Sequence, residues 1–114
     1  PRGVYGVGQW FPGCGGEAAI GVGEREFVEA YRERAGTSPG YPAVQAAATA
    51  IIAAHCVAAA GSTERGALWT VAGALETTTL YGTFKIDPRT GAQAGHRTTL
   101  TRWETGGPAA IRRE

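Results

Sequence analysis

The side chains most able to do chemistry are two histidines, His55 and His96, and two cysteines, Cys14 and Cys56. Nucleophilic catalysis needs a nucleophile held against a base, with a third group to orient the base. His55 lies in an apolar segment and His96 begins a predicted strand, and neither has an acidic partner in a recognisable arrangement. Nothing in the sequence marks Cys14 as a reactive thiolate. The sequence therefore predicts that the protein is not an enzyme.

The cysteine spacing bears on metals and disulfides. The chain has no CxxC motif and no histidine pair near either cysteine, so it lacks the ligand set of a zinc site. A disulfide between Cys14 and Cys56 stays open at this point, although a buried free thiol is the commoner state. We expect no metal and no cofactor.

A glycine-rich stretch raises the question of phosphate binding. Gly13, Gly15 and Ala18 have the G-x-G-x-x-A spacing of nucleotide-binding loops and follow a predicted strand. Pro12 interrupts the strand-to-helix junction that the motif needs, and no acidic residue ends a second strand about 20 residues later. The sequence therefore favours ordinary loop glycines over a phosphate cradle.

Composition bounds the class of protein. The chain has 114 residues, 43% hydrophobic and 18% charged, which suits one globular domain at most and argues against disorder. Its net charge of +1 gives no electrostatic basis for binding nucleic acid. The chain has no methionine and starts at Pro1, so we expect a processed or excised piece of a longer protein. Its opening residues carry no signal-peptide pattern.

The first elements follow from hydrophobic spacing. Residues 4–10 are predicted to form a short buried strand, and residues 11–23 form a loop dense in glycine. Residues 25–35 repeat apolar side chains at helical spacing, and the glycine that follows is a helix stop. Glu26 and Glu29, a candidate carboxylate pair, fall on the solvated side of this helix.

A second helix is predicted from Pro42 to Ala60, with Gly61 as its stop. Its length of about 18 residues is near the lower limit for crossing a bilayer. Gln45, Thr49 and His55 weaken that interpretation. Small side chains on every face suit a helix packed between a sheet and other helices, so we expect its alanines to lie in the core.

The remaining elements are shorter. Ser62 is predicted to cap a third helix that ends near Glu76. The tail then changes to strands at residues 80–86 and 96–104, separated by a turn at 87–91, with a short last strand after a glycine turn. We expect the first two of these strands to pair.

Several short motifs follow one another in a fixed order. They are Tyr41-x-Ala43-Val44-Gln45, Ala60-Gly61-Ser62, Gly82-x-Phe84-x-x-Asp87 and Gly91-x-Gln93. In this order, between Gly3 and about Ile111, the chain resembles the C-terminal third of a type I periplasmic binding protein. The similar group is the leucine/isoleucine/valine-binding family that serves ABC importers.

The resemblance implies an α/β fold with pieces of two Rossmann-like lobes, joined by crossover strands, and a ligand in the cleft between the lobes. Residues 1–38 would form the end of the second lobe and a crossing, residues 39–80 the first-lobe helices, and residues 81–114 the return strands. The rest of the two-lobed fold would supply the other wall of the cleft.

The resemblance also implies ligand-binding residues. Tyr41 would lie at the cleft mouth, where such proteins place an aromatic ring against the ligand; the alternative is that Tyr41 only packs against its own helix. Trp10, where the first strand ends, is a further candidate. Amino-acid binders of this family often carry an acidic residue where this chain has Arg2, and a guanidinium there would favour a carboxylate over an amine. The alternative is that Arg2 simply faces solvent.

The function that the resemblance implies is solute binding without catalysis. The chain would belong to the binding component of an ABC importer of branched-chain amino acids or related small organic acids. Its partners would be the small-molecule ligand (an amino acid, or an organic or aromatic acid) and a membrane permease, and its location the periplasm or another extracytoplasmic site. Two alternatives stay open: a ligand-sensing domain of a receptor or regulator with the same fold, and a small enzyme or nucleotide-binding domain built on the glycine loop.

Overall fold

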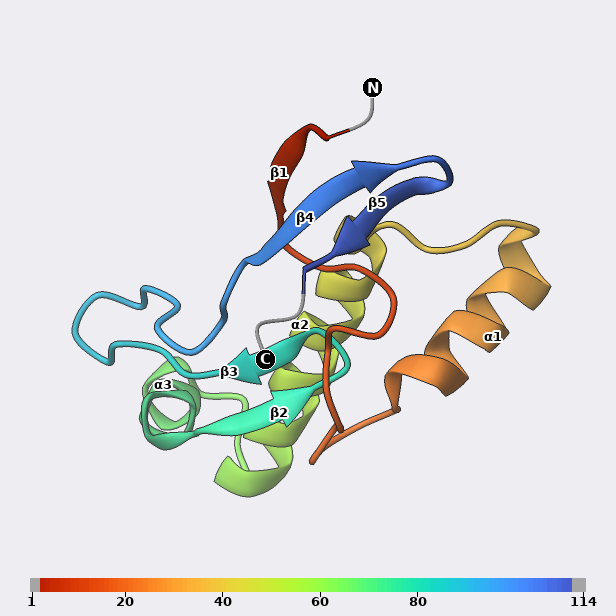
Figure 1. Cartoon of the computed structure of the whole chain (residues 1–114). Coiled ribbons are helices and arrows are strands. Elements are labelled where there is room, and N and C mark those ends of the chain that lie inside the picture. The colour runs from red at the N-terminus through yellow and green to blue at the C-terminus, as the bar shows by residue number, and fades with distance from the viewer. Residues whose placement is uncertain (1–2, 112–114) are drawn as a thin grey trace.

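The computed structural model describes residues 3–111 of the chain. These residues form an α/β arrangement in which helices and a short hairpin lie on one side of a protruding sheet (Figure 1). The elements are β1 (Tyr5–Gly8), α1 (Glu24–Ala35), α2 (Tyr41–Ala60), α3 (Arg65–Ala74), β2 (Thr77–Thr79), β3 (Gly82–Phe84), β4 (Thr99–Glu104) and β5 (Gly107–Ala110). Helices mixed with small sheets confirm the predicted α/β class.

The first two helices end where the sequence predicts. Gly36 and Gly61 follow the last helical residues with φ angles of 69° and 60°, in the left-handed conformation that a glycine adopts without strain. Each glycine donates its N–H back into its helix, Gly36 to the carbonyl of Arg32 and Gly61 to that of Val57.

The third helix is shorter than predicted, and its cap is different. Glu64, not Ser62, is the N-cap residue of α3, and it makes no side-chain cap hydrogen bond. The Ser62 hydroxyl instead accepts a hydrogen bond from the Glu64 N–H at 3.0 Å, which makes a turn before the helix. The prediction for Ser62 was wrong because its side chain stabilises this turn and the helix begins afterwards.

The strands form two separate antiparallel sheets. β4 lies between β1 and β5 in a three-stranded sheet, and β2 and β3 form a separate two-stranded sheet. The expected pairing of residues 80–86 with 96–104 was wrong, because Leu80 and Tyr81 form the β2–β3 turn and β4 pairs with β1 instead. The buried hydroxyl of Thr101 donates to the Gly6 carbonyl at 3.1 Å and links β4 to β1.

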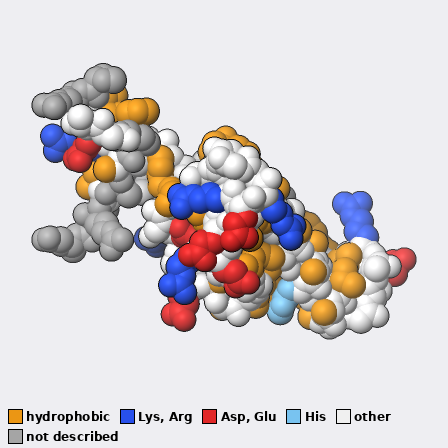
Figure 2. Space-filling model, turned by 90° about the vertical axis from the view of Figure 1, so that its right-hand side faces the viewer, with side chains coloured by type: hydrophobic (Ala, Val, Ile, Leu, Met, Phe, Trp, Pro, Cys, Tyr) orange, Lys and Arg blue, Asp and Glu red, His pale blue; other side chains and the backbone are white. Residues whose placement is uncertain are grey.

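The hydrophobic core is small. Val44 of α2 and Leu80 of the hairpin turn are fully buried, and Trp10, Val28 and Ala48 complete the cluster around them. The Cα radius of gyration is 15.8 Å, whereas a compact domain of this length has a value of about 13 Å. The chain is therefore extended, and Figure 2 shows apolar surface beside the mixed charges that α1 presents.

Helix α2 is half exposed, which corrects the expectation that its alanines are core residues. Only Val44, Ala48 and Cys56 are buried. These alanines of α2 are exposed: Ala46, Ala50, Ala53, Ala54, Ala58 and Ala59. By length and composition alone, α2 could also cross a membrane, since its best window has a mean hydropathy of 1.7. Because alanines lie on every face of α2, the sequence gave no periodic pattern that predicts which face packs against the core.

Two leucine substitutions, one buried and one exposed, test the assigned core. We expect Leu80→Ala to lower the free energy of unfolding by about 2–5 kcal/mol, because it removes a fully buried side chain. Leu100→Ala removes a side chain that is 45% exposed, and we expect a cost below about 1 kcal/mol. Urea unfolding followed by circular dichroism measures both values. Equal losses in the two variants would contradict the assigned core.

Candidate functional site

Tyr41 is the first residue of α2 and directly follows the N-cap Gly40. Its side chain is 47% exposed, while Val44 in the same turn is fully buried in the core. The ring is therefore carried by a firmly anchored helix end and keeps one side open. This position suits contact with a small molecule, and the role of Tyr41 stays a prediction.

Trp10 lies in a different environment. Its side chain is only 4% exposed and packs in the core cluster with Val28 and Leu80. The indole Nε1 is buried and has no hydrogen-bond partner within residues 3–111, which is costly for a donor. A direct ligand contact by Trp10 stays a prediction, and Arg2 lies outside the described residues.

A polar hollow of about 430 Å³ lies where residues 9–17, 78–83 and 95–99 meet. In its lining, the rings of Tyr81 and His96 stack with centroids 4.4 Å apart and planes inclined by 8°. His96 Nε2 lies 2.9 Å from the Gln9 carbonyl oxygen, so it donates this hydrogen bond when it carries the proton. His96 therefore joins the hairpin to the end of β1.

Tyr81 lines the polar hollow and lies near two other candidate side chains, those of Tyr41 and Cys14. Burial raises the pKa of the Tyr81 phenol, and the nearby Tyr41 and Cys14 raise this pKa further. The phenol oxygen is buried and lacks a hydrogen-bond partner in the described part of the chain. Tyr41, Cys14 and Tyr81 thus lie within one region, although they are far apart in the sequence.

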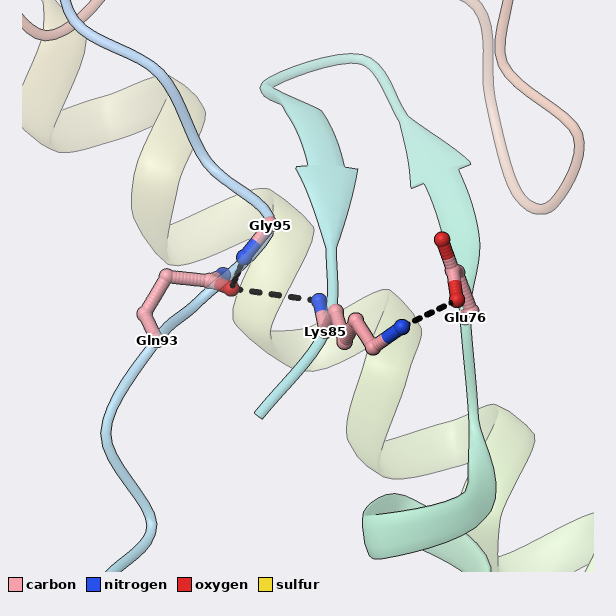
Figure 3. A network of polar contacts seen from close by, with 4 residues as sticks. All are labelled: Glu76, Lys85, Gln93 and Gly95. Atoms are coloured by element: carbon pink, nitrogen blue, oxygen red, sulfur yellow. Dashed lines mark hydrogen bonds and ion pairs between the residues drawn. The ribbon is translucent and has the colours of Figure 1, made fainter. Parts of the chain in front are cut away.

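The segment that carries His96 is fixed by a network of polar contacts (Figure 3). The Gln93 side-chain oxygen accepts hydrogen bonds from the backbone N–H groups of Lys85, at 3.1 Å, and Gly95, at 2.9 Å. The Lys85 ammonium also lies 2.6 Å from the Glu76 carboxylate, at the start of β2. These contacts hold the return segment against the hairpin and so position the His96 ring.

The glycine loop, residues 12–16, does not form the start of a helix. Helix α1 begins only at Glu24, so Gly13, Gly15 and Ala18 do not form a strand-to-helix phosphate motif. The N–H of Gly15 donates to the Glu24 carboxylate at 3.0 Å, and the N–H of Gly13 donates to its other oxygen. Gly13 and Gly15 therefore lie in a loop, as predicted.

An apolar groove of about 530 Å³ runs between α2, α3 and the β2–β3 hairpin. Apolar side chains from all three elements line it, among them Ile52, Leu68 and Phe84, with Gln45 and Arg65 as polar neighbours. The groove adjoins the exposed alanines of α2, which form what we call the open face of this helix. A surface of this kind usually marks contact with another apolar surface or ligand.

The described residues contain no group of three or more side chains that could hold a metal ion. Cys14 and Cys56 are both free thiols, so the disulfide that the sequence left open is absent between them. Cys56 is buried, and burial raises the pKa of its thiol, which disfavours the reactive thiolate.

Sequence reasoning missed Gln9, Glu24 and Tyr81 as parts of this region. Gln9 acts through its backbone carbonyl, which no sequence pattern reveals. Tyr81 was placed inside a strand, whereas it occupies a turn. Glu24 falls between the predicted loop and the predicted helix and carried no prediction, and its distance of nine residues from Gly15 hides their contact.

The buried phenol of Tyr81 gives a pH-dependent prediction. Because its pKa is raised above the ordinary value of 10, its contribution to stability is present below pH 10 and is lost as pH rises through the folded-state pKa. We expect Tyr81→Phe to unfold with a shallower loss of stability above pH 10 than the unmodified chain, and to stay within about 1 kcal/mol of it at neutral pH. Urea unfolding across this pH range measures the slope. Tyr5→Phe, at a ring that is 61% exposed, is the control and should keep the original slope.

The sequence was also compared with known proteins. A sequence profile described as periplasmic binding protein matches residues 2–108. No curated protein and no solved structure gives a significant match. The matched range includes every described helix and extends from β1 into β5. Proteins of this family bind small-molecule ligands, and they are in general extracytoplasmic and non-enzymatic. The chain belongs to the periplasmic binding protein family and carries part of its type I α/β fold.

Proposed function

We propose that the chain is part of the solute-binding component of an ABC importer, in the periplasm or an equivalent extracytoplasmic space. It would capture a branched-chain amino acid or a related small organic acid and deliver it to a membrane permease. The family match over residues 2–108 is the observation that carries this proposal. Capture between two lobes needs an open aromatic or polar wall on each lobe and a hinge between them.

Tyr41 supports a ligand wall at the start of α2. Its ring is half exposed and belongs to a helix end that the buried Val44 anchors in the core. An aromatic ring at an open position offers a large apolar contact area to a ligand. We propose that Tyr41 packs against the ligand's side chain, with Trp10 as the buried support of the adjoining loop.

The separation of the sheet from the helices supports the division into lobes. The β1–β4–β5 sheet lies apart from the helices and the hairpin, and two segments run between these parts (Figure 1). We propose that residues 1–38 end one lobe and cross, that residues 39–80 supply helices of the other, and that residues 81–114 return. The two boundaries rest on the family fold and not on this separation, because Val28 of α1 packs in one core with Val44 and Leu80, and β3 pairs with β2. His96 and Gln9 then hold the two crossing segments together.

The apolar groove supports a larger assembly of which this chain is one part. Its lining comes from α2, α3 and the hairpin, and it joins the exposed alanines of α2. An open apolar surface of this extent is unfavourable in water. We propose that the remainder of the same lobe packs over it in the two-lobed protein.

The role of Tyr41 can be tested by ligand binding. In the two-lobed protein, we expect Tyr41→Ala to weaken binding of the transported solute about tenfold, because a packed aromatic contact is lost. Tyr41→Phe should bind almost as well as the unmodified protein. Tyr31→Ala, in α1, is the matched control for removal of a tyrosine. Isothermal titration calorimetry measures all three, and an unchanged affinity in Tyr41→Ala would remove this residue from the site.

The ligand class needs a separate comparison. A guanidinium at Arg2 would attract a carboxylate and repel an ammonium group. We therefore expect the two-lobed protein to bind aromatic or aliphatic carboxylates more tightly than leucine, and Arg2→Gln to reduce this preference. Competitive titration of leucine against benzoate decides between them. Tighter binding of leucine would reject the preference for acids while leaving the importer role intact.

A further inference from the structure

The glycine loop already holds a carboxylate. The backbone N–H groups of Gly13 and Gly15 point to the same side of the loop and donate to the two oxygens of Glu24. Alternate backbone N–H groups that converge in this way form a small anion-binding concavity. Glu24 reaches it from the first turn of α1.

Close packing keeps this concavity in shape. A side chain at Gly15 would overlap the carbonyl oxygen of Leu80 and would lie 2.9 Å from the Glu24 carboxylate. The loop therefore rests directly on the β2–β3 turn, and only glycine fits there. Farther along, the N–H of Ala19 donates to the Thr78 carbonyl at 2.9 Å and holds the segment against β2.

A second opening gives access to the concavity from solvent. A hollow of about 610 Å³ lies between the loop and α1, and its lining includes Gly13, Glu24, Arg25 and Arg32. Glu17, Glu26 and Glu29 also line it, so acidic side chains outnumber basic ones. This excess of negative charge opposes entry of an external anion while Glu24 is present.

We propose that the N–H groups of Gly13 and Gly15 form a carboxylate-binding site, which the protein's own Glu24 occupies and which a small external monocarboxylate enters when Glu24 is removed. The intramolecular carboxylate prevails in the unmodified chain because it is tethered one turn away at a high effective concentration. The acidic lining selects a singly charged, compact anion over a multiply charged one. This inference does not depend on the solute that the importer would carry.

The occupied site couples α1 to the polar hollow. Gly15 and Cys14 line that hollow, and Cys14 accepts a hydrogen bond from the Phe11 N–H at 3.0 Å. Cys14 is half-buried in this arrangement. We expect release of Glu24 to free the loop from α1 and to increase the exposure of Cys14, because the two hydrogen bonds that tie the loop to the helix are lost. The reactivity of the Cys14 thiol therefore reports whether the site is filled.

The test uses the complete chain and alkylation of Cys14 by iodoacetamide, followed by peptide mass spectrometry. We expect Glu24→Ala to speed labelling about tenfold, because two hydrogen bonds to a charged group are lost. Sodium acetate or formate, at tens of millimolar, should restore slow labelling, whereas sodium chloride at equal ionic strength should not. Buried Cys56 is the internal standard and should label slowly throughout.

Two further variants keep the result interpretable. Glu26→Gln lowers the acidic charge of the same hollow without touching the loop hydrogen bonds, so its labelling should match the unmodified chain. Glu24→Gln keeps the side chain's size, but its amide has one accepting oxygen, so one of the two glycine N–H groups loses its partner. Its labelling rate should lie between those of the unmodified chain and Glu24→Ala, and acetate should not change it because the amide still occupies the site. If Glu24→Ala fails to fold by circular dichroism, an unchanged labelling rate in Glu24→Gln overturns the proposal. In a folded Glu24→Ala variant, unchanged labelling or equal effects of acetate and chloride also overturn it.

Discussion

The contact between Gly15 and the Leu80 carbonyl constrains the arrangement of the whole helical part. This contact places the glycine loop against the β2–β3 turn. The same turn contains Leu80, which packs at the centre of the core with Val44. Trp10 closes this core because it lies just before the same loop. The stacked rings of Tyr81 and His96 then fall at the edge of the same turn and connect it to the end of β1. One close backbone approach therefore places the core, the polar hollow and the crossing segments relative to one another.

Several polar side chains form hydrogen bonds that hold separate backbone segments together. Gln93 bonds two backbone N–H groups, His96 bonds a backbone carbonyl and Glu24 bonds two glycines. None of these groups is arranged as a nucleophile with its base. This agrees with membership of a binding-protein family, in which the protein must hold a shape and close on a ligand.

Some of these features could be predicted from the sequence, and others could not. The ends of α1 and α2 followed from Gly36 and Gly61, because a helix that stops in the left-handed conformation needs a glycine. A strand over residues 96–104 and a short last strand after a glycine turn were also predicted, but their pairing as the β4–β5 hairpin was not. The exposed side of α2 could not be predicted, because alanine on every face gives no periodic signal. The β2–β3 turn was missed because Leu80 is apolar and fully buried, which is typical of a strand interior and not of a turn. Contacts such as Glu24 with Gly15 depend on tertiary packing and leave no local pattern.

The open face of α2 also limits what can lie against it. Its exposed residues are largely alanines, whose side chains extend one methyl group from the backbone. Two helices that meet through such residues approach to the short end of the usual range of interaxial distances, about 8 Å. Neighbouring backbone would then be so near that even a leucine in place of one alanine would push the two surfaces apart. The alanines of α2 thus require a short distance to any neighbouring helix, as well as an apolar surface on that neighbour.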